Sequence, residues 1–97
     1  GGVGCISVTA NVAPKLCSDM QKFSRSNSDN EINEAERIDR ILQPLHKSLF
    51  IESNPGPVKY AAKLLNLCDD AVRLPLVKIT KKTQDEVKKA LVNAKLI

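Results

Sequence analysis

The chain has 97 residues and a net charge of +4, and 42% of its residues are hydrophobic while only 3% are aromatic. This length fits one small domain or part of a larger one, and the hydrophobic content argues against a disordered chain. The fifteen basic residues are spread among eleven acidic ones, and no apolar run has the length of a membrane span, so we expect neither a nucleic-acid nor a membrane partner.

The first expected element is a β-strand over residues 4–9, because apolar and β-branched residues follow a glycine-rich turn in "GGVGCISVT". The helix that follows is expected to be capped by Asn11 and to carry Pro14 in its first turn. Its apolar stripe consists of Leu16, Met20 and Phe23. The polar stretch "SRSNSDN" predicts a loop after this helix.

A second, longer helix is expected to reach Ile51. Ser28 and Glu31 have the spacing of a capping box, which predicts its start. Pro44 falls inside it, and because proline removes one backbone donor and clashes with the preceding turn, we expect a kink or break near residues 41–44. The apolar stripe of this helix comprises Ile32, Ala35, Ile38, Leu42, Leu45 and Leu49.

Two further helices are expected in the second half of the chain. Asn54 is the candidate cap of a short helix that ends near Leu67, with Pro57 early in it. The next stretch, "CDDAVRLPLVKIT", has no helical period and predicts an extended loop. Thr83 and Glu86 have capping-box spacing and predict the start of the last helix. The expected total is therefore one strand and four helices, one of them kinked.

The residue types alone indicate few side chains that could take part in catalysis. His46 has no cysteine or acidic partner at helical spacing, so a structural or surface role is the better interpretation. The three cysteines, Cys5, Cys17 and Cys68, lack metal-ligand spacing and are expected to be reduced thiols in the cytoplasm. No cofactor or metal ion is expected. On this basis the chain is a mostly helical domain, and its residue types do not indicate a function.

Four phrases in order, "GGVGCISVTANVAP", "LQPLHKSLFIESNPGPVKYAAKLL", "VRLPLVKIT" and an amphipathic terminal helix, resemble the C-terminal third of the dihydrodipicolinate synthase family. The resemblance covers essentially the whole chain. It implies the last strand and helix of a (β/α)8 barrel in residues 1–26, and an appended helical domain in residues 27–97. The fold expected for this chain is thus mainly α, with one β-strand.

The resemblance also implies a chemistry. The family condenses pyruvate with aspartate semialdehyde in lysine biosynthesis, through a Schiff base on a lysine of the sixth strand. That lysine has no counterpart in this chain, so the chain alone is expected to be inactive. One position carries over: Ile6, whose counterpart lines the pyruvate site. Tyr60, Lys59 and Lys63 match the helical domain, where packing is the plain interpretation. The full-length relatives are expected to be homo-oligomers, with tetramers typical of the family.

The presence of only one expected barrel strand leads to a further prediction. A parallel barrel needs eight strands, whereas one strand alone leaves its backbone donors and acceptors unpaired. We therefore expect the first ten or so residues to fray or to pair with another chain, a second copy included. The first residue, Gly1, hints at processing or truncation. The alternatives are a non-catalytic helical interaction module and one part of a nicked enzyme.

Overall fold

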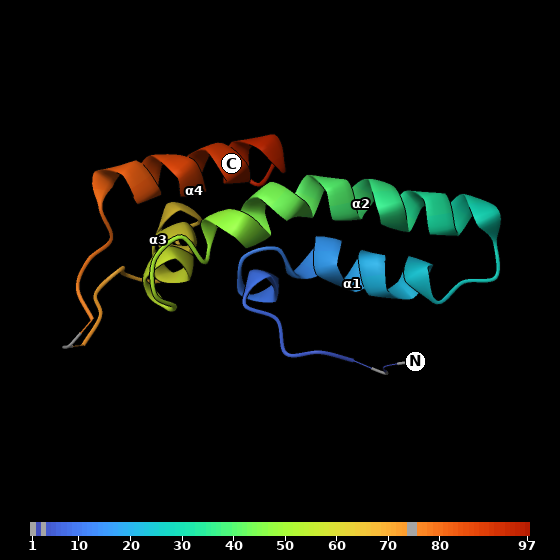
Figure 1. Ribbon diagram of the computed structural model, residues 1–97, viewed down its shortest axis with the longest axis horizontal. Helices are drawn as coiled ribbons and strands as arrows, with labels where there is room; N and C mark the ends of the chain where they lie inside the picture. The colour runs from blue at the N-terminus through green and yellow to red at the C-terminus, as the bar shows by residue number, and fades with distance from the viewer. Residues whose placement is uncertain (1, 3, 74–75) are drawn as a thin grey trace.

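The computed structural model describes residues 2, 4–73 and 76–97. Within them lie one short 3-10 helix and four α-helices: η1 (Thr9–Asn11), α1 (Pro14–Ser24), α2 (Asp29–Ser48), α3 (Gly56–Leu64) and α4 (Lys81–Asn93). Figure 1 shows α1 running beside the long α2, with α4 above and α3 near the far end of α2. The four predicted helices are confirmed. They form a mainly helical structure.

The predicted strand over residues 4–9 is wrong for the described residues of this stretch. Residues 4–7 are extended but belong to no sheet, and Val8 already has helical backbone angles (φ −65°, ψ −44°). The carbonyl of Thr9 then accepts hydrogen bonds from the N–H groups of Val12 and Ala13, at 3.1 and 2.9 Å. A strand is stabilised by ladder hydrogen bonds to a neighbour, and the described part of the chain supplies no such neighbour.

The core is aliphatic, as the scarcity of aromatic residues predicts. It forms where α2 packs against α1 and α4 and where α3 packs against α4. The predicted stripe of α2 is buried apart from Ile32, which is exposed at the start of the helix. The core cluster includes Val12, Ala13, Ile38, Leu42, Leu45, Leu49, Val58, Ala61, Val87, Ala90 and Leu91. Val12 and Ala13 thus share a core with the later helices, while the division at residue 26 stays a prediction.

The first helix, α1, is the least buried of the four. None of its residues is fully buried. Its predicted apolar stripe packs only partly against the core, through Leu16, Met20 and Phe23. A half-covered apolar stripe is expected of a helix that packs against more than the described part of this chain offers.

Three predicted helix starts need correction. Ala13, not Asn11, precedes α1, because Asn11 is part of η1, where its side-chain amide donates to the carbonyl of Val8 at 3.0 Å. Pro55, not Asn54, precedes α3. Thr80, not Thr83, caps α4: its side chain accepts a hydrogen bond from the Thr83 N–H.

Ser28 does stand at the N-cap position of α2, yet its side chain makes no capping hydrogen bond. Of the predicted kink or break near residues 41–44, a break does not occur, since α2 is continuous from Asp29 to Ser48 with Pro44 inside it. Figure 1 shows the light-green end of α2 inclined toward α3, away from the line of its teal end. Acidic side chains in the first turn and Lys47 in the last turn suit the dipole of so long a helix.

Candidate functional site

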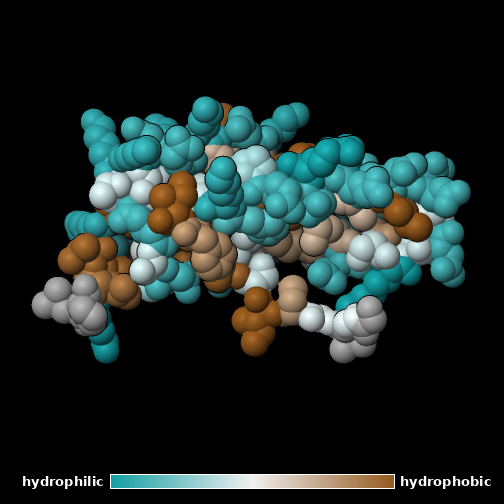
Figure 2. Space-filling view, viewed as in Figure 1, coloured by the Kyte–Doolittle hydropathy of each residue, from teal (hydrophilic) through white to brown (hydrophobic). Residues whose placement is uncertain are grey.

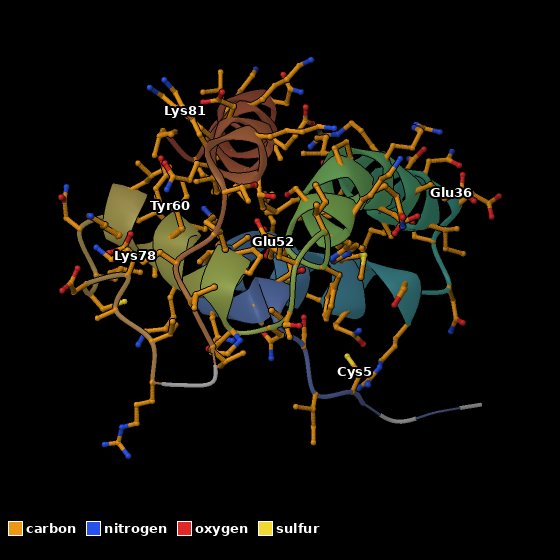
Figure 3. The ribbon with its side chains drawn as sticks, turned by 60° about the vertical axis from the view of Figure 1, so that its left-hand side comes forward. Cys5, Glu36, Glu52, Tyr60, Lys78 and Lys81 are labelled. Carbon is orange, nitrogen blue, oxygen red and sulfur yellow. The ribbon has the colours of Figure 1, made fainter. Side chains whose placement is uncertain are left out.

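The candidate site begins with the extended stretch that precedes η1. Figures 1 and 3 both show this stretch standing apart from the helices, and Figure 3 places Cys5 on it. Ile6 is fully exposed (105%), and a Cβ placed on Gly4 would meet nothing within 4 Å. The structure therefore leaves Ile6 outside any hollow formed by the described residues, and its predicted place beside pyruvate stays a prediction.

Hydrogen bonds fix the end of this stretch firmly. Thr9 is almost fully buried, and its hydroxyl lies 2.6 Å from Nδ1 of His46 on α2. One residue later, the N–H of Ala10 donates to the hydroxyl of Ser7 at 3.2 Å. The structural role expected for His46 thus gains a specific partner. Sequence reasoning missed the pair because the two residues are 37 positions apart.

A hollow of about 400 Å³ lies between the extended stretch, α1 and α2. Its lining is mostly apolar and includes Cys5, Ser7, Cys17, Met20 and His46. Burial raises the pKa of the Cys17 thiol above its usual value, opposed by a hydrogen bond with Ser7 and assisted by nearby Cys5. A raised pKa keeps the thiol protonated and disfavours nucleophilic chemistry. Across the described residues, no three His, Cys, Asp or Glu side chains come together as a metal site.

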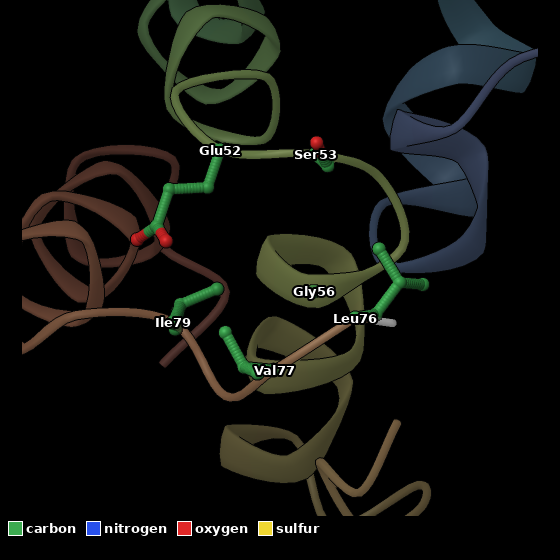
Figure 4. A pocket seen from close by; sticks show the side chains of 6 residues that line it. All are labelled: Glu52, Ser53, Gly56, Leu76, Val77 and Ile79. Atoms are coloured by element: carbon green, nitrogen blue, oxygen red, sulfur yellow. The ribbon is translucent and has the colours of Figure 1, made fainter. Parts of the chain in front are cut away.

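A smaller hollow of about 170 Å³ lies where the turn after α2 faces the segment before α4. Figure 4 shows the Glu52 side chain reaching over Ile79 toward the start of α4. Its carboxylate accepts hydrogen bonds from the N–H and the hydroxyl of Thr80, at 2.9 and 3.1 Å. Together with the Thr83 hydroxyl, these hydrogen bonds lower the pKa of Glu52. The contacts serve to hold α4 in place.

The residues of α3 that resemble a helical-domain motif have structural contacts. Lys59 donates to the carbonyl of Ala71, and Nζ of Lys63 lies 3.3 Å from a carboxylate oxygen of Asp70. Tyr60 packs partly buried against the core. These contacts tie the following loop to α3. They agree with the packing interpretation of the sequence.

The visible surface over α2 and α4 is mostly hydrophilic. Figure 2 shows teal side chains over these helices, with single brown, hydrophobic ones among them and others at the lower edge of the molecule. Exposed large hydrophobic residues include Ile6, Phe50, Ile51, Leu67, Val77 and Val92. Among the helices that the structure describes, none has both the length and the hydropathy of a membrane span.

The sequence and the structure identify the class of protein to which the chain belongs. A family model for the dihydrodipicolinate synthetase family matches residues 1–94, and the chain belongs to this family. The 4-hydroxy-tetrahydrodipicolinate synthase of Pelagibacter ubique is 68% identical over 97 residues, which are all of this chain and 33% of that enzyme. The chain thus spans about a third of the length of the curated relatives that it matches.

Solved structures agree with this assignment. The crystal structure of dihydrodipicolinate synthase from Thermotoga maritima matches all of this chain and 32% of its own, with a TM-score of 0.92 and 37% identity. The chloride-inhibited enzyme of Acinetobacter baumannii, complexed with pyruvate, matches to the same extent, with a TM-score of 0.88 and 36% identity. The described part of this chain therefore has the conformation of a part of a dihydrodipicolinate synthase, an enzyme of lysine biosynthesis.

Proposed function

We propose that the chain supplies the C-terminal third of a cytoplasmic dihydrodipicolinate synthase, with residues 1–26 closing the barrel and residues 27–97 forming the helical domain. The complete enzyme condenses pyruvate with aspartate semialdehyde and assembles as a homo-oligomer. The observation that carries the proposal is the extended, unpaired stretch 4–7, held at its end by the helical part. All of the chain matches a part, about a third, of a solved synthase.

Within that enzyme, Ile6 forms part of the wall of the pyruvate pocket. Its side chain is fully exposed in the chain by itself, and burial of an isoleucine against neighbouring strands is worth about 1.5–3 kcal/mol. An exposed isoleucine on an unpaired extended stretch thus has a reason to be buried in a larger assembly. The pyruvate complex of the Acinetobacter baumannii relative supports the choice of ligand.

The test is a hybrid enzyme in which these 97 residues replace the matching third of the Pelagibacter ubique relative. We expect the hybrid to condense the two substrates, and the chain alone to have no activity because it lacks the Schiff-base lysine. Ile6→Ala in the hybrid should raise KM for pyruvate, whereas the matched control Ile32→Ala, exposed on α2, should leave it unchanged. A soluble hybrid without activity would contradict the proposal.

A second candidate function is a non-catalytic helical interaction module. The observation in its favour is that most of the core cluster comes from α2, α3 and α4, with Leu42, Leu45 and Leu91 fully buried. Such a core permits the helical part to fold by itself. The discriminating measurement is the mass of the native protein: a species near three times 10.6 kDa supports the synthase, and one at 10.6 kDa supports the module.

A further inference from the structure

We propose that the hydrogen bond between Thr9 and His46 is a positioning contact, through which the helical part sets the place of Ile6 in the pyruvate pocket. The inference rests on the proposed function. Neither residue touches pyruvate in this account. Both act through the short stretch of backbone between Thr9 and Ile6.

Going back along the chain from the helices toward Ile6, Thr9 is the last residue that is firmly held. Its side chain is 2% exposed, its hydroxyl lies 2.6 Å from Nδ1 of His46, and its carbonyl accepts two backbone hydrogen bonds. By contrast, Gly4 has open space around it and Ile6 is fully exposed. The transition from a held to a free backbone thus falls within three residues, between Ile6 and Thr9.

His46 provides a rigid support for this contact. It lies on α2 between Leu45 and the buried residues of the last turn, and Leu42, Leu45 and Leu49 are each 0% exposed. Side chains on a tightly packed helix have little freedom to shift. The imidazole therefore fixes Thr9 relative to the core side chains of α2, although the two residues are 37 positions apart in the sequence.

The turn after the extended stretch is stiff enough to carry that position on to Ile6. The Ser7 hydroxyl accepts from the Ala10 N–H at 3.2 Å, and the carbonyl of Val8 accepts from the backbone and the side chain of Asn11, at 3.1 and 3.0 Å. Ile6 lies three residues before Thr9, and Val8 between them has helical backbone angles. A rotation at Thr9 therefore also moves Ile6, and misplacement of a binding group by about 1 Å can cost up to about a hundredfold in rate.

The experiment uses the hybrid enzyme with Thr9→Val, which removes the hydroxyl but keeps the shape, and Thr9→Ser, which keeps the hydroxyl. We expect Thr9→Val to raise KM for pyruvate by about three- to tenfold, the effect of losing one net hydrogen bond. KM for aspartate semialdehyde should change little. Thr9→Ser should restore KM for pyruvate, which ties the effect to the hydroxyl group.

His46→Ala is the second variant, with Lys47→Ala, exposed in the same turn of α2, as its control. We expect His46→Ala to raise KM for pyruvate as Thr9→Val does, and the double variant to be no worse than either single one, because both remove the same bond. Amide hydrogen exchange over residues 5–8 gives a readout independent of turnover. It should accelerate in Thr9→Val and stay slow in Thr9→Ser.

The outcomes separate the two proposals. If the unaltered hybrid binds pyruvate and Thr9→Val changes neither KM for pyruvate nor exchange over residues 5–8, the positioning role is wrong while the proposed function stands. If the unaltered hybrid forms no pyruvate adduct, the proposed function fails and the positioning role with it. Additive effects of Thr9→Val and His46→Ala would also overturn the inference.

Discussion

The carboxylate of Glu52 joins the turn after α2 to the first residue before α4, because one of its oxygens accepts both the N–H and the hydroxyl of Thr80. The two residues are 28 positions apart. Thr80 in turn caps α4 by accepting from the N–H of Thr83. A negative charge at this end also suits the helix dipole. The contact thus fixes the start of α4 with respect to α2 (Figure 4).

This contact predicts a pH-dependent stability. Hydrogen bonds from the Thr83 hydroxyl and the Thr80 N–H hold the pKa of Glu52 below its ordinary value of 4.5 in the folded chain. The stabilisation by the carboxylate is therefore complete above about pH 4.5 and is lost as the pH falls through the lowered pKa. Relative to the native chain, Glu52→Gln should melt at a lower temperature at pH 7, and the difference should shrink below pH 4.5. A difference that stays constant down to pH 3 would contradict this explanation.

The N-cap positions of α4 and α2, Thr80 and Ser28, should differ in their effect on stability. Thr80→Ala removes the only side-chain cap among the described helix starts and should cost about 1 kcal/mol of unfolding free energy. Ser28→Ala should cost much less, because the Ser28 side chain makes no capping hydrogen bond. Urea unfolding of the two variants measures the difference, and Thr80→Ser is the control that keeps the hydroxyl. Equal losses in Thr80→Ala and Ser28→Ala would show that the caps are wrongly assigned.

These caps also illustrate what the sequence could and could not predict. The four helices follow from local patterns, namely apolar stripes and the spacing of capping residues and prolines, and most stripe positions of α2 are buried. The choice of Thr80 over Thr83 depends on Glu52, and the role of His46 depends on Thr9. Both partners are far away in the sequence, so local spacing carries no signal for them.

The extended stretch was predicted as a strand because its residue types favour one, but a strand also needs a neighbour. Among the described residues the chain has none, and the backbone turns helical at Val8. The candidate site was predictable only through resemblance, since Ile6 alone carries no chemistry. Composition and periodicity gave the helices and the aliphatic core, while long-range partners determined the rest.

Gly56 should not tolerate a side chain. A Cβ at Gly56 would lie 2.8 Å from Cγ2 of Ile79, which is buried and close to its own backbone. Overpacking of this kind typically costs about 1–3 kcal/mol, so Gly56→Ala should lower the unfolding free energy by about that amount. Gly4→Ala is the matched control, because open space surrounds it.

The clash can be tested by removing its other half. In an Ile79→Ala background, Gly56→Ala should cost much less, since the methyl group that it meets is gone. Denaturant unfolding of the four chains completes the cycle. If Gly56→Ala costs the same in both backgrounds, the close approach to Ile79 is not the reason for glycine at this position.

Lys95 occupies a backbone conformation that suits glycine better. Its φ is 59°, and it ends α4 in a Schellman motif, in which the N–H of Leu96 donates to the carbonyl of Leu91 at 3.0 Å. Lys95→Gly should therefore raise the unfolding free energy by about 0.5–1 kcal/mol, the relief of strain less the extra entropy of glycine. Asn66→Gly, at a φ of 61° after α3, should gain less because asparagine tolerates this region. A loss of stability in Lys95→Gly would contradict the argument.

The central claim is that this chain completes a synthase that forms a Schiff base with pyruvate. Borohydride reduction in the presence of pyruvate, followed by intact-mass measurement, tests it most directly. We predict that the hybrid with these 97 residues gains one reduced pyruvate per protomer, and that the 97-residue chain alone gains none. A folded hybrid that gains no mass, or an isolated chain that does, would contradict the account.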